Sequence, residues 1–182
     1  MCSPIGDGGS AAILCAEGIA KRYRSNPIHI AGSGMASGVF LEIDIDREKL
    51  NSTELAAREA FEMSGIGPED VNVAEIHNAF SPAELTFFEE IGFCKKGEAP
   101  RFIEEGRTDL GGSIPINTSG GLESKGHPVG ATGLAMISEI VWQLRGEAGR
   151  RQIESPKVGL VHNGGGIIGG DNAVMCVHIL KR

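Results

Sequence analysis

The 182 residues are enough for one domain with a substantial hydrophobic core. With 41% hydrophobic and 23% charged residues the composition is that of a soluble globular protein, and no apolar run approaches the roughly twenty residues of a membrane-spanning helix. A net charge of −7 argues against nucleic acid or an anionic membrane as partner, and four scattered cysteines predict reduced thiols in a cytoplasmic protein and no metal site.

The first elements along the chain are short. The apolar run 10–15 predicts a buried strand, and residues 16–23 predict a helix after it. Residues 27–31 predict a second strand that ends at Gly32-Ser33-Gly34. The chain starts abruptly with no capping element, so we expect it to begin in the middle of a larger protein. Cys15 and Cys176 lie in apolar strand candidates, and we interpret them as inert core thiols.

Helical periodicity is clearest in two later segments. Residues 51–64 predict an amphipathic helix that Ser52 or Thr53 caps and Gly65 ends. Residues 128–144 predict the longest helix, with an apolar face made of Leu134, Ile137, Ile140, Val141 and Leu144. Between them we predict strands at 71–76 and 114–116, a helix at 83–91 and a polar surface excursion at 94–112, and after them strands at 157–161 and 172–180.

Alternation of strands and helices, with a final strand pair, predicts an α/β fold whose layered sheet has mixed direction. From residue 27 onward the prediction contains five strands. Three polar clusters each follow a predicted strand directly: His77-Asn78, the segment 117–127, and His162-Asn163. Because loops at the carboxyl ends of strands gather on one edge of such a sheet, we expect three histidines to converge there.

His127 stands out within these clusters because it lies at the start of the longest predicted helix. Pro128 suits the first helical turn, and Gly120, Gly121, Gly126 and Gly130 leave the surrounding backbone bare. A histidine in this position is suited to move a proton or to bind an oxyanion, while the alternative is a histidine that only caps a turn.

Three stretches resemble the signatures of the thiolase superfamily. Gly126-His127-Pro128 resembles its Gly-His-Pro signature, and the His-Asn-Ala-Phe at 77–80 resembles the His-Asp-Cys-Phe signature of sterol-carrier-protein-x-type thiolases. The segment 161–166 is similar to the His-Asn-x-Gly signature of that same type. The resemblance covers the whole chain and implies the C-terminal half of an enzyme that makes or breaks a carbon–carbon bond beside a CoA thioester.

The resemblance also implies roles for individual residues. The nucleophilic cysteine would lie on an absent first half, where His127 would help to form its thiolate and donate to a thioester oxyanion. His77 would help to hold that oxyanion, with Asn78 in place of the family's acidic residue, and Gly164 would offer an N–H to a second oxyanion hole. Gly126 and Asn163 flank these groups, Ser33 and Gly34 would line the pantetheine arm, and CoA would be a substrate, with no further cofactor.

One departure bears on the chemistry. The acid/base of the Claisen step is usually a second cysteine, but Ala79 and His162 stand at the two places where thiolases carry it. We hypothesise that His162 or His77 transfers the proton instead. Two alternatives remain open, a thiolase-fold aldolase or lyase that cleaves a 3-hydroxyacyl-CoA and a non-catalytic scaffold subunit.

The same resemblance implies how the chain is divided and what it binds. Residues 1–25 would be the last strand and helix of the missing first half, and residues 26–182 the thiolase C-terminal domain. Expected partners are the first half, a second copy in a homodimer or tetramer, and a small zinc-ribbon/OB-fold acyl-CoA-binding protein.

Overall fold

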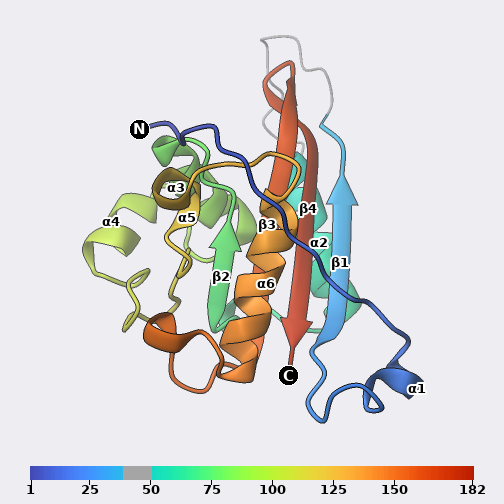
Figure 1. Ribbon diagram of the computed structural model, residues 1–182. Coiled ribbons are helices and arrows are strands. Elements are labelled where there is room, and N and C mark those ends of the chain that lie inside the picture. Colours follow the sequence, from blue (N-terminus) through green and yellow to red (C-terminus); the bar gives the residue numbers. More distant parts are fainter. Residues whose placement is uncertain (39–50) are drawn as a thin grey trace.

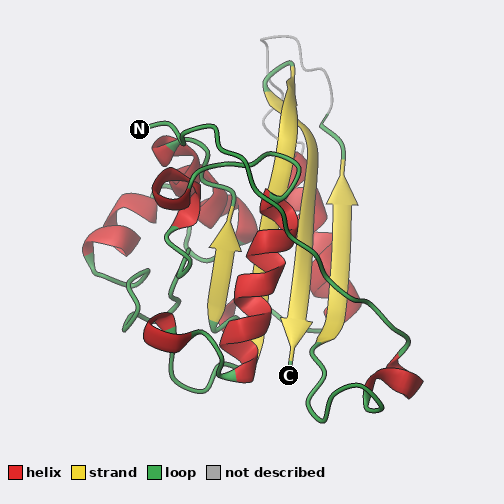
Figure 2. Ribbon diagram, viewed as in Figure 1, coloured by secondary structure: helices red, strands yellow, loops and turns green. Residues whose placement is uncertain are grey.

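A four-stranded mixed sheet forms the centre of the computed structural model, which describes residues 1–38 and 51–182. The strands lie in the order β1-β4-β3-β2 (Figures 1 and 2). Strands β3 and β4 form a long antiparallel hairpin, β2 pairs with β3 in parallel, and β1 pairs with β4 antiparallel. Their bounds are β1 His29–Ala36, β2 Val73–Ile76, β3 Val158–Ile168 and β4 Asp171–Lys181. The predicted α/β class with a mixed sheet is confirmed.

Two of the predicted strands do not form. Residues 114–116 make only one parallel bridge, from Ile116 to Ala74 of β2, so the described sheet has four strands rather than five. The run 10–15 is irregular and exposed, with 97% of Ile13 accessible, and the helix after it is the single turn α1 (Glu17–Ala20). No described strand pairs with this run, so its apolar side chains and Cys15 stay at the surface, and the prediction of a core thiol there is wrong.

Helix α2 (Ser52–Ser64) covers one face of β1 and β4. It begins with a capping box between Asn51 and Glu54 and ends at Gly65, whose φ is 64°. A Cβ on Gly32 or Gly34 would lie only 2.1 Å from a main-chain oxygen of α2. The Gly32-Ser33-Gly34 stretch is therefore the middle of β1 and not the end of the strand as predicted, and its glycines let the helix approach the strand.

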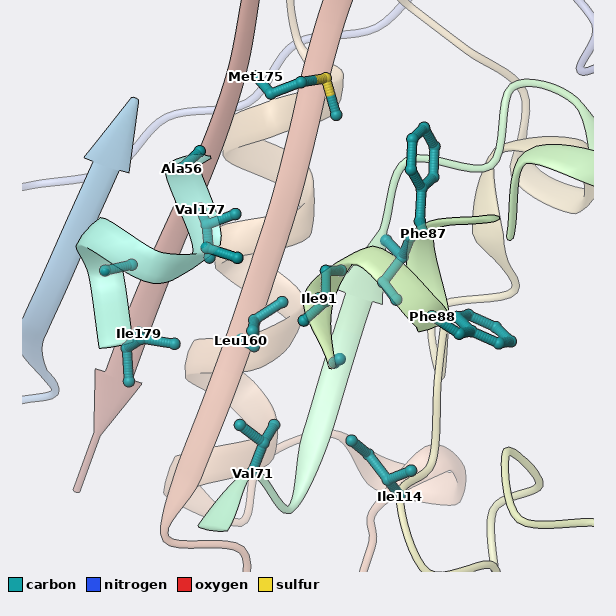
Figure 3. Packing of buried hydrophobic residues seen from close by; sticks show 14 of the residues in the cluster. Ala56, Val71, Phe87, Phe88, Ile91, Ile114, Leu160, Met175, Val177 and Ile179 are labelled. Carbon is teal, nitrogen blue, oxygen red and sulfur yellow. The ribbon is translucent and has the colours of Figure 1, made fainter. Parts of the chain in front are cut away.

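The core on this face is completed by α3 (Ser81–Ile91) and α4 (Ala99–Glu104). Figure 3 shows Leu160 and Val177 of the hairpin facing Ala56 of α2 and Ile91 of α3. The prediction that 94–112 is only a surface excursion is wrong, because Ala99 and Phe102 of α4 are buried. Two buried residues in a charged segment give too weak a periodic pattern to indicate a helix.

Helix α6 (Thr132–Arg145) packs on the opposite face of the sheet. Its buried apolar side chains are Met136, Ile140 and Leu144, whereas Leu134 is 40% exposed, so the packed face is rotated from the predicted one. The helix begins at Thr132 rather than Pro128, after the short helix α5 (Gly121–Lys125) and a turn. Two 3₁₀ turns, η1 (Pro68–Asp70) and η2 (Gly149–Arg151), complete the described helices. None of the described helices has the length and hydropathy to traverse a bilayer.

The N-terminal segment crosses the α6 side of the sheet (Figure 1). Its first residues lie between the loop after β2 and the loop after α5. The Ser3 N–H donates to the Ala79 carbonyl at 2.9 Å, and the His127 N–H donates to the Pro4 carbonyl, also at 2.9 Å. This segment therefore ties the two loops that carry His77 and His127.

Candidate functional site

His77 and His127 meet at the upper edge of the sheet. His77 directly follows β2, and His127 follows α5. Their ring centroids are 5.0 Å apart, and the rings stand edge to face at 79°. Both side chains are partly exposed. The structure thus brings together two of the three predicted histidine clusters.

Each ring is held through its Nδ1 atom. The His77 Nδ1 lies 2.8 Å from the Asn163 Oδ1, and the His127 Nδ1 lies 2.8 Å from the Thr132 Oγ1. A carbonyl oxygen only accepts, so His77 donates from Nδ1. The Thr132 hydroxyl donates to the Pro128 carbonyl at 3.1 Å, so it accepts from the His127 Nδ1–H. Both neutral rings then carry their lone pair on Nε2, and no hydrogen bond between described residues engages either Nε2.

The surroundings favour the neutral form of both rings. Burial lowers the pKa of His127. Burial also lowers the pKa of His77 and outweighs the opposing bond to Asn163, and the nearby His127 adds a smaller lowering. Two neutral imidazoles with free Nε2 atoms can each accept a proton near pH 7, and each can afterwards donate it to a developing oxyanion.

His162 does not join this pair. It lies inside β3 and is fully buried, with its ring centroid 4.4 Å from that of Phe87 and its Nε2 3.4 Å from the Thr53 Oγ1. Its Nδ1 has no hydrogen-bond partner among the residues that the structure describes, and burial lowers its pKa to about 3. The predicted convergence of three histidines is therefore wrong, because β3 continues to Ile168 and its pleat sends His162 and Asn163 to opposite faces.

Asn78 holds the neighbouring loop and not the ring of His77. Its side chain is 7% exposed, and its Oδ1 accepts the Leu122 N–H at 2.7 Å. Gly126 ends α5 with φ at 86°, a conformation that permits the turn into His127. Gly164 follows Asn163 in β3, opposite Met175 of β4.

Ser33 and Gly34 lie elsewhere in the sheet. They belong to β1, which β4 separates from β3, so they are two strands away from Asn163. The Ser33 hydroxyl lies 3.0 Å from the Nδ1 of His178, and Gly34 packs against α2. The structure does not place either residue beside His77 and His127.

Two supporting groups were not predicted from the sequence. Thr132 fixes the His127 ring, and Glu75 of β2 holds the loop before His127 by accepting from the N–H and the hydroxyl of Ser119 at 2.9 and 2.6 Å. Burial raises the pKa of Glu75, although Lys125 and Ser119 oppose that effect. A carboxylate in the middle of an apolar strand was the one signal that pointed to Glu75.

An open hollow lies beside the histidine pair. It has a volume of about 380 Å³ and is lined by residues 6–10 and 128–131. Val129 in its lining is 73% exposed, and Ile5, which directly precedes the lining residues, is 94% exposed. Within the part of the chain that the structure describes, no group of three or more His, Cys, Asp or Glu residues is placed to hold a metal ion.

Residues 44–182 match the family model described as thiolase C-terminal domain-like. The chain belongs to this family. It is 44% identical over its whole length to an acetyl-CoA acetyltransferase of Methanothermobacter thermautotrophicus. It is also 42% identical over 93% of its length to the human protein named sterol carrier protein 2. The chain spans only 46% and 32% of these two relatives.

The fold of this chain is similar to that of a solved structure named Ltp2-ChsH2(DUF35) aldolase. It superposes with a TM-score of 0.73 at 28% identity, over 85% of this chain and 39% of that one. The resemblance that the sequence motifs indicated is therefore confirmed at the level of the family, and relatives with different named activities share it.

Proposed function

We propose that this chain is the C-terminal half of a thiolase-like acyl-CoA acyltransferase, which condenses acyl-CoAs or cleaves a 3-oxoacyl-CoA. The observation that carries the proposal is the orientation of the His127 ring. Thr132 bonds its Nδ1, which leaves its Nε2 free among the described residues, and the ring lies beside that of His77. Membership of the thiolase family and the similarity to acetyl-CoA acetyltransferases support it.

In the proposed reaction the nucleophilic thiol comes from the part of the protein outside this chain. The His127 Nε2 takes the thiol proton, and the thiolate attacks the thioester carbonyl to form a carbon–sulfur bond. The resulting imidazolium donates to the oxyanion and returns its proton to the CoA sulfur that leaves. Gly164 and Asn163 lie at the same edge, where we propose that they border the acyl group.

We assign the second proton transfer to His77. Its Nε2 is free, its ring centroid is 5.0 Å from that of His127, and its depressed pKa keeps it in the basic form. It would take the α-proton in condensation or return it after cleavage. The buried ring of His162 is a poorer candidate, because a missing half of the protein can cover His162 further but cannot expose it.

The proposed partner of this face is the first thiolase half. The relatives are at least twice as long as the chain, and apolar side chains on the α6 side remain exposed. These include Leu134 and Trp142 on α6 and Ile5 and Val129 at the hollow. The division at residue 26, the homodimer or tetramer, and CoA as substrate belong to the same proposal.

A retro-aldol lyase on a 3-hydroxyacyl-CoA is the second candidate function. The similar solved structure is named an aldolase, and its name joins two components. Cleavage of this kind needs a base such as His77 and no acyl-enzyme, so the loss of the second thiol would not matter. A small zinc-ribbon/OB-fold protein is then the partner to test by co-expression.

The test uses the full-length protein with acetoacetyl-CoA and free CoA. We expect acetyl-CoA to form, and His127→Ala to lower kcat by about a thousandfold while the melting temperature stays within a few degrees. Cleavage of a 3-hydroxyacyl-CoA without added CoA, insensitive to alkylation of the nucleophilic cysteine, would favour the lyase. Full thiolytic activity in His127→Ala would contradict the acyltransferase, and full lyase activity in His77→Ala would contradict the lyase.

A further inference from the structure

The carboxyl group of Glu84 on α3 lies between the two histidine loops. Its Oε1 accepts the Asn117 Nδ2–H at 2.6 Å, and the side chain of Asn78 is near enough to lower the pKa of the same carboxyl. Asn117 opens the segment that leads to His127, and Asn78 directly follows His77. One carboxyl group on the core side of the site therefore binds the loop of His127 directly and interacts with the side chain that follows His77.

The Oδ1 atoms of the Asn117 and Asn78 amides accept further hydrogen bonds that link the two loops. The Asn117 Oδ1 accepts the Ile76 N–H at 2.8 Å, one residue before His77, and the Asn78 Oδ1 accepts the Leu122 N–H at 2.7 Å, on the way to His127. Each amide thus receives a hydrogen bond from the loop to which it does not belong. Asn117 has a φ of 53°, and this unfavourable backbone conformation persists because both ends of its side chain are bonded.

Gly121 leaves the room that this arrangement needs. Its φ is 66°, and a Cβ at this position would lie 2.5 Å from the Asn78 Nδ2. The loop before His127 is therefore pressed against the side chain that follows His77, and any larger residue would push the two apart.

The geometry points to Glu84 as a positioning residue that couples the two histidine loops, with Asn78 as its matched amide. This inference rests on the proposed function only for its activity measurement. The His-Asp-Cys-Phe signature has an acid where this chain has Asn78, and an acid here would place two carboxylates in contact and remove the N–H donor. Glu123 of α5 is the other charged group that faces Glu84.

The decisive experiment is a double-mutant cycle in the full-length protein. We expect Asn78→Asp to lower kcat for acetoacetyl-CoA cleavage by about tenfold with KM for CoA nearly unchanged, since misplaced catalytic groups affect the chemical step. We expect its melting temperature to fall by about 5 °C. Adding Glu84→Gln should restore most of both losses, because the glutamine donates to the new carboxylate and removes the repulsion.

Glu89→Gln supplies the control. Glu89 is on the same helix, but its carboxyl accepts from the N–H groups of Gly97 and Ala99, away from the histidines. The control should not rescue Asn78→Asp. The inference would be overturned if Asn78→Asp left kcat and the melting temperature unchanged. It would also be overturned if Glu89→Gln restored the losses of Asn78→Asp as well as Glu84→Gln does.

A second readout separates this inference from the proposed function. Hydrogen exchange of the Leu122 amide should accelerate at least tenfold in Glu84→Ala and change little in Glu89→Ala, whatever reaction the protein catalyses. If the wild type cleaves no CoA thioester, hydrogen exchange at Leu122 and the melting temperatures of the double-mutant cycle still test the coupling. Unchanged exchange in Glu84→Ala would refute it even in an active enzyme.

Discussion

Two His-Asn dipeptides in this chain have opposite arrangements. In the first, His77 faces His127 and Asn78 is buried against the adjacent loop. In the second, Asn163 bonds the His77 ring, and His162 is buried on the other face of the sheet beside Phe87. The first dipeptide therefore supplies its histidine to the candidate site, whereas the second supplies its asparagine.

The difference follows from where each strand ends. Strand β2 ends at Ile76, so His77 lies in a loop and can turn toward the site. Strand β3 runs past the dipeptide, so the alternation of the pleat decides which side chain faces α6. The hydrogen bonds also differ: the Nδ1 of His77 is bonded to Asn163, whereas the buried Nδ1 of His162 has no partner among the described residues. His77 therefore belongs to the candidate site, and His162 belongs to the packing region around Phe87.

Among substitutions of the residues that hold the two histidine rings, removal of the Thr132 hydroxyl should have the largest effect on activity. Thr132→Val keeps the shape of the side chain but leaves the His127 Nδ1–H without its acceptor, so the ring loses its fixed tautomer. We expect kcat to fall by about 10- to 100-fold. The pH–rate profile of the full-length enzyme, with Thr132→Ser as the conservative control, measures this. Retained activity in Thr132→Val, or no recovery in Thr132→Ser, would show that the hydroxyl does not orient the ring.

Substitution within the second dipeptide should separate activity from stability. His162→Ala removes a fully buried ring and should lower the free energy of unfolding by about 2–4 kcal/mol, while kcat of the folded enzyme changes by about twofold or less. Asn163→Ala should do the reverse, lowering kcat by about tenfold with a smaller loss of stability. Urea unfolding and steady-state kinetics on both variants give the comparison. A large loss of kcat in a stable His162→Ala would assign the proton transfer to His162 after all.

Local sequence signals predicted some elements well. The bounds of α2 were predicted to within one residue and Gly65 ends it as expected, but the N-cap is Asn51, whereas the predicted caps Ser52 and Thr53 lie inside the first turn. The approach of His77 to His127 was predicted from the rule that loops after strands share an edge of the sheet, although the strand expected at 114–116 is only a single bridge and His127 follows α5. The end of α2 depended on a residue at the feature itself, Gly65.

Pairing between distant segments was not visible in the sequence. The glycines after Asn163 suggested a loop, but Gly164 and Gly165 pair with Met175 and Val174 of β4, and this pairing keeps His162 in a strand. In the same way, Thr132 was not singled out because its role depends on a ring five residues earlier across a turn. Glu84 lay inside a predicted helix with nothing to indicate that both loops would reach it.

The smallest expected effect concerns a carboxyl group linked to the packing region. Glu90 of α3 accepts the Asn51 Nδ2–H at 2.6 Å and lies near Thr53, whose hydroxyl is 3.4 Å from the His162 Nε2. Burial raises the pKa of Glu90 to about 7 against the opposing bonds from Thr53 and Asn51, with Glu54 and Asp171 raising it further. The folded protein thus holds a proton that the unfolded chain releases near its ordinary pKa.

The sign of the pH dependence follows from that difference. A carboxyl whose folded pKa is raised contributes most to stability at low pH, and this contribution is lost as the pH rises from about 4.5 to about 7. Glu90→Gln should therefore stabilise the protein by about 1 kcal/mol at pH 8, a value reduced for partial exposure, and by almost nothing near pH 5. Urea unfolding at both pH values measures the gap, with the exposed Glu62→Gln on α2 as control. A gap that is constant with pH would place the proton on another group, and a change in kcat would mean that the packing region and the histidine pair are not independent.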